Sequence, residues 1–278
     1  MEYLDQLSIA FADFVWGPPL VALLLGGGLF FAAYSRLLPY RHFGHALGLV
    51  LGRHNSPGQP GELTHGQALA AALSGTMGLG NISGVALAIV AGGPGAVFWM
   101  WMSALVGVAT KFFTCSLGVM YRGEDSLGRL QGGPMYIIRE ALPRRFYPLA
   151  LLFSAAGLIG TLPIFQANQL TALIRENLLP QADPLSSSIG IGCALALLVG
   201  IVIFGGLKRV ANVAVAVLPI MVVIYLGMTV YMLSIHLEEI PAIFGSIVSE
   251  AFSPAAAGGG LLGVMLIGVS RGAFSNEA

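Results

Sequence analysis

The chain has 278 residues, of which 56% are hydrophobic and only 9% are charged, and its formal net charge at pH 7 is zero. A soluble domain has about 25% charged residues, so this composition indicates a polytopic protein of the lipid bilayer and gives no indication of nucleic-acid binding. The sequence contains no Gly-x-x-x-x-Gly-Lys-Ser/Thr and no His-Glu-x-x-His motif, which argues against an ATP-driven pump and against one common class of hydrolase. We therefore expect a protein that is not an enzyme and that needs no cofactor.

Six apolar stretches are long enough to cross a bilayer, which takes about 20 residues of helix, and they predict an all-α polytopic membrane protein. In chain order they are 15–38, 66–91, 95–121, 147–174, 187–207 and 210–235, and a seventh begins near 254. The stretch 240–249 is too short to span and is predicted to be a surface or re-entrant helix. Thr64-His-Gly-Gln67 fits a capping box, so the second span is expected to begin there.

Basic residues follow alternate spans, and this pattern predicts the orientation of the chain. The loops after the first, third and fifth spans contain Arg36, Arg41, Arg53, Arg122, Arg129, Arg139, Arg144, Arg145, Lys208 and Arg209, whereas Arg175 is the only basic loop residue on the opposite side. Because cytoplasmic loops carry the excess of Lys and Arg, the N-terminus is expected outside and the second span is expected to enter from the cytoplasm. We expect a multi-pass protein of the plasma membrane, which in a bacterium is the inner membrane.

The second predicted span contains a polar, glycine-rich interruption, Gly75-Thr-Met-Gly-Leu-Gly-Asn-Ile-Ser-Gly84. Glycine costs about 1 kcal/mol relative to alanine inside a helix, so three glycines beside Thr76 and Asn81 predict a helix that opens near mid-membrane. Backbone groups freed at that depth are tolerated where they line a cavity, and secondary transporters use such breaks to hold a cation and an anion. The alternative is that Gly80-x-x-x-Gly84 only allows helices to pack closely.

A second interruption, 268–278, lies in the apolar stretch that begins near 254. Arg271 and Glu277 would lie inside this span, where charged side chains are costly and usually functional. We expect the helix to break near Gly272, so that two broken helices run in from opposite sides, as an inverted repeat requires. The alternative is a structural ion pair between Arg271 and Glu277.

Polar side chains also occur in the fourth predicted span, 147–174. Gln166 and Gln169 are three residues apart and share a helix face, Pro163 is expected to bend the helix, and Phe165 could form an apolar wall for a small ligand. Neutral amides can bind a zwitterion without a fixed charge. The alternative is that they hydrogen-bond to neighbouring helices.

Six blocks of this sequence resemble the alanine or glycine:cation symporter family, often called sodium:alanine symporters. The blocks are Gly75-Thr-Met-Gly-Leu-Gly-Asn-Ile-Ser-Gly84, Gly92-Gly-Pro-Gly-Ala-Val-Phe-Trp-Met100, Ala109-Thr-Lys-Phe112, Gly132-Gly-Pro-Met-Tyr136, Phe165-Gln-Ala-Asn-Gln169 and Arg271-Gly-Ala-Phe-Ser-Asn-Glu-Ala278. The resemblance implies a leucine-transporter-like inverted-repeat helical bundle, in which 15–38 is an extra helix, 66–235 is the first five-helix repeat, and 254–278 starts an incomplete second repeat. Members of the family are longer, so we expect an N-terminal fragment from which the remainder of the transporter is missing.

The resemblance also implies a site for a small neutral amino acid and a sodium ion. The substrate-binding residues would be Thr76, Gly78, Gly80, Asn81, Phe165, Gln166, Gln169, Phe274 and Ser275, and the sodium ligands would be Thr76, Met77, Asn81 and Asn276. The expected function is sodium-coupled symport of alanine or glycine by alternating access. Two alternatives stay open: a proton-coupled carrier in which Glu277 carries the proton, and a truncated membrane protein that does not transport.

Overall fold

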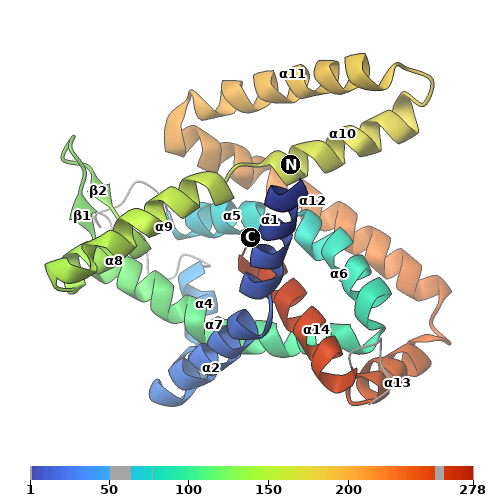
Figure 1. Ribbon diagram of the computed structural model, residues 1–278, viewed down its shortest axis with the longest axis horizontal. Coiled ribbons are helices and arrows are strands. Elements are labelled where there is room, and N and C mark those ends of the chain that lie inside the picture. The colour runs from blue at the N-terminus through green and yellow to red at the C-terminus, as the bar shows by residue number, and fades with distance from the viewer. Residues whose placement is uncertain (1, 51–63, 77, 254–259, 278) are drawn as a thin grey trace.

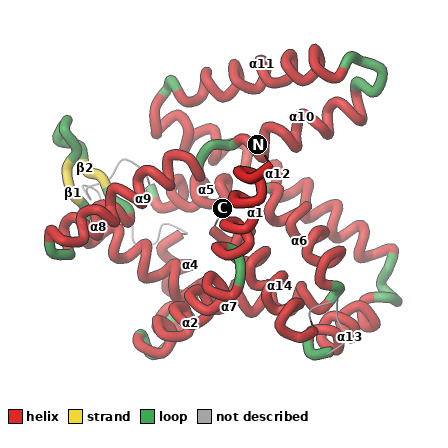
Figure 2. The backbone as a smooth tube through the Cα atoms, viewed as in Figure 1, coloured by secondary structure: helices red, strands yellow, loops and turns green. Residues whose placement is uncertain are grey.

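The computed structural model describes residues 2–50, 64–76, 78–253 and 260–277, and this part of the chain is almost entirely helical (Figure 1). The α-helices are α1 (Glu2–Val15), α2 (Pro18–Tyr34), α3 (Leu38–Arg41), α4 (Phe43–Val50), α5 (His65–Thr76), α6 (Leu79–Gly92), α7 (Gly95–Met120), α8 (Pro134–Ala141), α9 (Tyr147–Gly160), α10 (Ile164–Leu178), α11 (Pro184–Ile203), α12 (Gly206–Ile235), α13 (Ile240–Ala251) and α14 (Gly260–Glu277), and a 3₁₀-helix, η1, covers Arg144–Phe146. Strands β1 (Gly123–Glu124) and β2 (Leu130–Gln131) form a short antiparallel hairpin, drawn in yellow in Figure 2.

Five stretches of the described chain are helical, long and apolar enough to cross a membrane. They are Ile9–Tyr34, His65–Gly92, Gly95–Met120, Pro184–Ile203 and Gly206–Ile235. These stretches coincide with five of the six predicted spans, and the prediction of an all-α polytopic membrane protein is confirmed. The short helix predicted over 240–249 is also present, as α13.

The fourth predicted span, 147–174, is two helices instead of one. Helix α9 ends at Gly160 and α10 begins at Ile164, and a loop separates them (Figure 2). Pro163 has no backbone N–H to continue the helix, and the residue before a proline avoids the α conformation. Pro163 therefore interrupts the helix completely, whereas the sequence predicted only a bend. The two helices have 14 and 15 residues, so neither alone reaches the length of a full span.

Helix α14 packs mainly against α7 and α6, which lie on either side of it in Figure 1. Ala88 of α6, Ala96 and Met100 of α7, and Val264 of α14 form a buried apolar cluster between these three helices. Two of the four side chains are alanines, and such small residues let membrane helices approach each other closely. This packing attaches α14 to α6, the helix that follows the predicted break in the second span.

The predicted break near Gly272 is wrong, because α14 is a continuous helix from Gly260 to Glu277. Gly272 serves close packing instead. A Cβ atom on this residue would clash with Ser103 Oγ of α7 and would lie 3.1 Å from Met100 Cα. The missing side chain therefore brings α14 against the backbone of α7, and helical hydrogen bonding continues through the glycine.

The start of α5 is capped as the sequence predicts and is attached to α12. The Thr64 N–H donates to Gln67 Oε1 at 3.0 Å, and the Gln67 N–H donates to Thr64 Oγ1 at 3.3 Å, which is the reciprocal pair of a capping box. Gln67 Nε2 also donates to Asn212 Oδ1 at 3.0 Å. Since α5 and α12 pack against each other, α12 flanks the approach to the break.

Helices α10 and α11 form an antiparallel pair at the upper margin of Figure 1. The main packing partner of α10 is α11, and α11 in turn packs against α12. This arrangement places α10, and the glutamines predicted to line a pocket, at the edge of the described helices.

Candidate functional site

The helix of the second span is interrupted where the sequence predicts it. Helix α5 ends at Thr76 and α6 begins at Leu79, and Gly78 between them has an extended backbone with φ −145° and ψ −156°. Met77 lies outside the described residues. The last carbonyls of one helix and the first N–H groups of the next have no intrahelical partners, and they carry partial negative and positive charge respectively. The break therefore presents backbone groups that suit both a cation and an anion.

Asn81 bridges the two sides of the break. Its Nδ2 donates to the carbonyl oxygen of Thr76 at 2.7 Å, and its backbone N–H donates to the carbonyl oxygen of Gly78 at 3.1 Å. The Thr76 hydroxyl turns back along α5, where it reaches the carbonyl oxygens of Ala72 at 3.1 Å and Leu73 at 3.2 Å. These bonds compensate backbone groups that an unbroken helix would have paired. One amide side chain thus stabilises the local geometry of the opening.

Ser275 joins α14 to this bridge. Its side-chain oxygen donates to Asn81 Oδ1, and the residue is only 6% exposed. The buried hydroxyl and the half-buried amide of Asn81 stabilise each other, because a buried polar group left unpaired costs about 1–3 kcal/mol. Thr76, Asn81 and Ser275, all predicted site residues, are therefore brought together by the fold, from segments nearly 200 positions apart.

A cavity of about 290 Å³, here called the inner cavity, lies beside the break. Gly78, Asn81 and Ile82 line it on one side, and α12 lines the other side with Met221, Ile224, Tyr225 and Met228. Its volume is at the lower end of the range typical of small-ligand sites. A mostly apolar wall opposite the opened backbone suits a small ligand that has a polar end and an apolar end.

The α12 side of the inner cavity was not predicted from the sequence. Its members recur at positions 221, 224, 225 and 228, which is the spacing of one helix face. The same spacing recurs throughout an apolar span, however, so it cannot indicate which face meets the break. Methionines are flexible and adapt to differently shaped apolar ligands, so this wall is a candidate determinant of ligand size.

The other predicted site residues are not part of this constellation as the structure describes it. Gln166 and Gln169 belong to α10, and neither is among the residues that line the inner cavity. Gln166 is exposed and Gln169 half-buried. The side chains of Phe165, Phe274 and Asn276, and the surroundings of Gly80, lie outside what the structure describes. The roles implied for all of these residues remain predictions.

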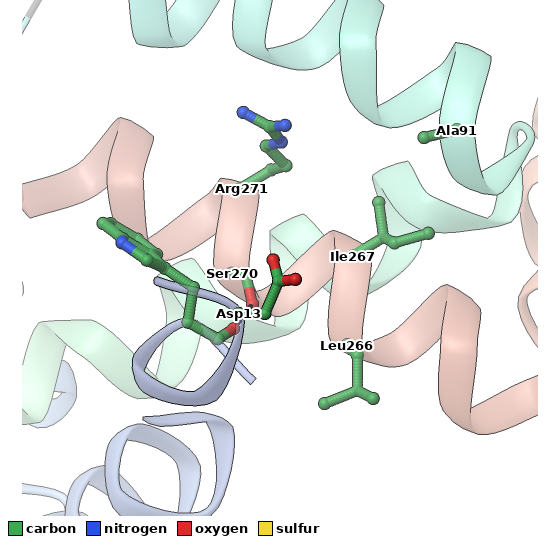
Figure 3. Close-up of a pocket in the computed structure, with 7 residues that line it drawn as sticks. Asp13, Ala91, Leu266, Ile267, Ser270 and Arg271 are labelled. Atoms are coloured by element: carbon green, nitrogen blue, oxygen red, sulfur yellow. Dashed lines mark hydrogen bonds between the residues drawn. The ribbon is translucent and has the colours of Figure 1, made fainter. Parts of the chain in front are cut away.

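A second and larger cavity, of about 710 Å³, lies between α1, α6 and α14 and is here called the outer cavity (Figure 3). It is lined by Asp13, Trp16, Ala91, Leu266, Ile267, Ser270 and Arg271. Ser270 Oγ donates to the carbonyl oxygen of Trp16 at 3.0 Å, which connects α14 to the junction of α1 and α2. The side chain of Glu277 is outside the described part, so the predicted pair of Arg271 with Glu277 stays a prediction.

Residues Gly268-Val-Ser-Arg-Gly272 match the Gly-x-Ser-x-Gly pattern of serine hydrolases, but their structure excludes that interpretation. In those enzymes the serine lies on a sharp turn between a strand and a helix. Here the five residues are in the middle of α14, and the Ser270 hydroxyl binds a backbone carbonyl instead of a histidine. The match is therefore coincidental.

Comparison with known proteins gives one consistent family. The sodium:alanine symporter family model matches residues 1–278. The sodium/alanine symporter AgcS of Methanococcus maripaludis is 37% identical over 96% of this chain and 59% of its own length. The putative sodium/proton-dependent alanine carrier protein YrbD of Bacillus subtilis is 38% identical over 96% of this chain and 55% of its own length. The probable sodium/glutamine symporter GlnT of Bacillus subtilis is 32% identical over 96% of this chain and 54% of its own length.

The chain thus spans somewhat more than half the length of the curated relatives that it matches. The match extends over all the described helices, and the helix break at Thr76–Leu79 lies inside it. The family model is that of a symporter family, and the relatives are named as symporters or carriers, so the comparisons indicate a transporter family and not a family of enzymes. On these observations the chain belongs to the sodium:alanine symporter family.

Proposed function

We propose that the protein carries alanine or glycine across the plasma membrane together with sodium, by alternating access in a leucine-transporter-like fold. The observation that carries this proposal is the opened backbone between Thr76 and Leu79. The Asn81 side chain donates to the Thr76 carbonyl there, and Ser275 donates to the Asn81 side chain. The names of two relatives, a sodium/alanine symporter and an alanine carrier, support the choice of substrate and coupling ion. The name of a third relative gives glutamine as a competing substrate.

The residues at the break suit both ligands. Backbone N–H groups at the start of α6 are a favourable place for the substrate carboxylate, because a helix N-terminus attracts anions. Thr76, Asn81 and Ser275 offer hydroxyl, amide and carbonyl oxygens, the type of donor that a hard cation such as sodium prefers. The apolar α12 face then lies where a small side chain would be received.

The packing of the two halves of the broken helix supports alternating access. Helix α5 is attached to α12 through Gln67 and Asn212. Helix α6 instead packs against α7 and α14 through the buried apolar cluster that contains Ala88. The two sides of the break therefore belong to different packed groups. Rocking of one group against the other would expose the site alternately to the two sides of the membrane.

Uptake of labelled alanine into proteoliposomes with an imposed sodium gradient tests the coupling. We expect accumulation that follows the gradient and collapses when potassium replaces sodium outside. Asn81→Ala should weaken both alanine uptake and its dependence on sodium, since it removes the side chain that bridges the break. Uptake that ignores the sodium gradient would remove the coupling, and normal behaviour of the variant would remove Asn81 from the site.

Proton coupling is the second candidate, and one observation favours it: a relative is named as sodium/proton-dependent. Glu277 is then the candidate proton carrier, because it is an acidic residue in a predicted span. Uptake driven by a pH gradient without sodium, and lost in Glu277→Gln, would support this version. A chain that folds in detergent but shows no alanine-dependent rise in melting temperature would support the third possibility, a membrane protein that does not transport.

A further inference from the structure

The outer cavity brings together two opposite charges that the sequence separates by more than 250 positions. Asp13 comes from α1 and Arg271 from α14, and both line the same space of about 710 Å³. In Figure 3 the Arg271 side chain extends away from Asp13, and no ion pair joins the two within the part of the chain that the structure describes. The two charges therefore line one cavity without pairing with each other, and a ligand in it can contact both.

Both charges lie in apolar segments, where an ionised side chain is expensive unless it has a function or contact with water. Asp13 is within the candidate span Ile9–Tyr34, and Arg271 is in the middle of a helix whose other cavity-lining residues include Leu266 and Ile267. An arginine binds a carboxylate through two parallel hydrogen bonds. A carboxylate such as Asp13 binds an ammonium group. A molecule that carries both charges, a zwitterion, is the ligand that satisfies the two together.

The outer cavity is aligned with the break along one face of α14. Arg271 precedes Ser275 by four residues, so both lie on the same side of the helix, and Ser275 is hydrogen-bonded to Asn81. Ala91 also lines the outer cavity, near the end of α6 that is remote from the break. The Arg271 side of the outer cavity is therefore about one helical turn from Ser275. From there the cavity extends to Ala91, toward the end of α6 that the predicted orientation places outside.

We propose that the outer cavity is a first binding site for the transported amino acid, with its carboxylate on Arg271 and its ammonium on Asp13. The ligand binds there as a zwitterion before it moves along α14 to the break. This inference rests on the proposed function, because it assumes that the ligand is an amino acid. The family resemblance implies one substrate site, at the break. The inference adds a second site, in the outer cavity, with Asp13 and Arg271 as its ligand-binding residues.

Weak binding to the purified protein, measured by saturation-transfer NMR without any ion gradient, tests the site. The Asn81→Ala variant serves as the background, since it impairs the site at the break and leaves the outer cavity intact. Three probes separate the two charges: alanine has both groups, propionate lacks the ammonium, and alaninamide lacks the carboxylate. Arg271→Gln should weaken alanine and propionate about tenfold and leave alaninamide unchanged. Asp13→Asn should weaken alanine and alaninamide and leave propionate unchanged.

Arg41→Gln is the matched control, because it removes one exposed arginine at the end of α3 and should change none of the three affinities. If Arg271→Gln does not give a monodisperse protein, Arg271→Lys replaces it; lysine keeps the charge without the paired hydrogen bonds, and a smaller loss for alanine and propionate is expected. Equal losses for all three probes would show a structural role and overturn the proposal, as would unchanged affinities. Failure of sodium-driven uptake with this probe pattern intact would instead remove only the proposed function.

Discussion

Gly268 in α14 offers the sharpest test of the packing described above. A Cβ atom there would lie 2.5 Å from the carbonyl oxygen of Ala96 and 2.6 Å from Trp99 Cβ, and these atoms of α7 cannot rotate out of the way. Overpacking of this kind costs about 1–3 kcal/mol, whereas replacing a helical glycine with alanine favours the helix by about 1 kcal/mol. Gly268→Ala should therefore leave stability unchanged or lower it by about 2 kcal/mol.

Gly263 in the same helix is the matched control, because a Cβ atom on it would meet nothing within 4 Å. Gly263→Ala should raise stability by about 1 kcal/mol through helix propensity alone, so the two variants should differ by about 1–3 kcal/mol. Unfolding of each purified protein in one detergent, followed by circular dichroism, measures the difference. Equal shifts for the two alanines would refute the view that glycine brings α14 against α7.

Three further predictions concern the break, the inner cavity and a helix cap. Ser275→Ala removes the donor to Asn81 Oδ1, so the KM for alanine should rise by about two- to tenfold. The control Ser246→Ala, at a half-buried serine bonded within its own helix, should leave the KM unchanged. An unchanged KM in Ser275→Ala would disconnect α14 from the site. Met228→Trp fills part of the 290 Å³ inner cavity, so competition assays should show weaker inhibition by larger amino acids with inhibition by glycine retained; an equal loss for both would point to misfolding instead of size selection. Asp183 accepts hydrogen bonds from the backbone N–H and hydroxyl of Ser186 at the start of α11, and these bonds hold the pKa of its carboxyl below the usual 3.8. Because the carboxyl has a lower pKa in the folded than in the unfolded chain, this stabilisation is present above pH 3.8 and is lost as the pH falls through the folded pKa. The difference in melting temperature between wild type and Asp183→Ala should therefore shrink on acidification. A difference that stays constant from neutral pH to pH 3 would contradict the capping role.

The break in the second span could be predicted because its cause is local. Between Gly75 and Asn81 three of the seven residues are glycines, which disfavour a helix. The segment also supplies Thr and Asn, which bond to nearby backbone groups. Asn81 does so across the opening, to the carbonyl of Thr76. The capping box at Thr64 and Gln67 was predictable for the same reason.

The prediction at Gly272 failed because the role of a glycine depends on what lies opposite it. At Gly78 the chain leaves the helix, whereas at Gly272 the backbone stays helical and α7 occupies the space of the missing side chain. The segments 75–84 and 268–278 contain similar sets of glycines and polar residues. Only the neighbouring helix distinguishes an opening from a contact.

By itself, the amino-acid sequence determined that this is a helical membrane protein of the sodium:alanine symporter family, and where one of its helices opens. Composition, apolar length and local turn chemistry act over a few residues, so they can be read along the chain. The tertiary structure alone decided that Ser275 meets Asn81, that Met221, Tyr225 and Met228 form the wall facing the break, and that Asp13 and Arg271 share one cavity. These contacts join segments far apart in sequence, and they depend on how each helix is rotated and placed. The spacing of residues along an almost uniformly apolar helix does not show which face meets which neighbour.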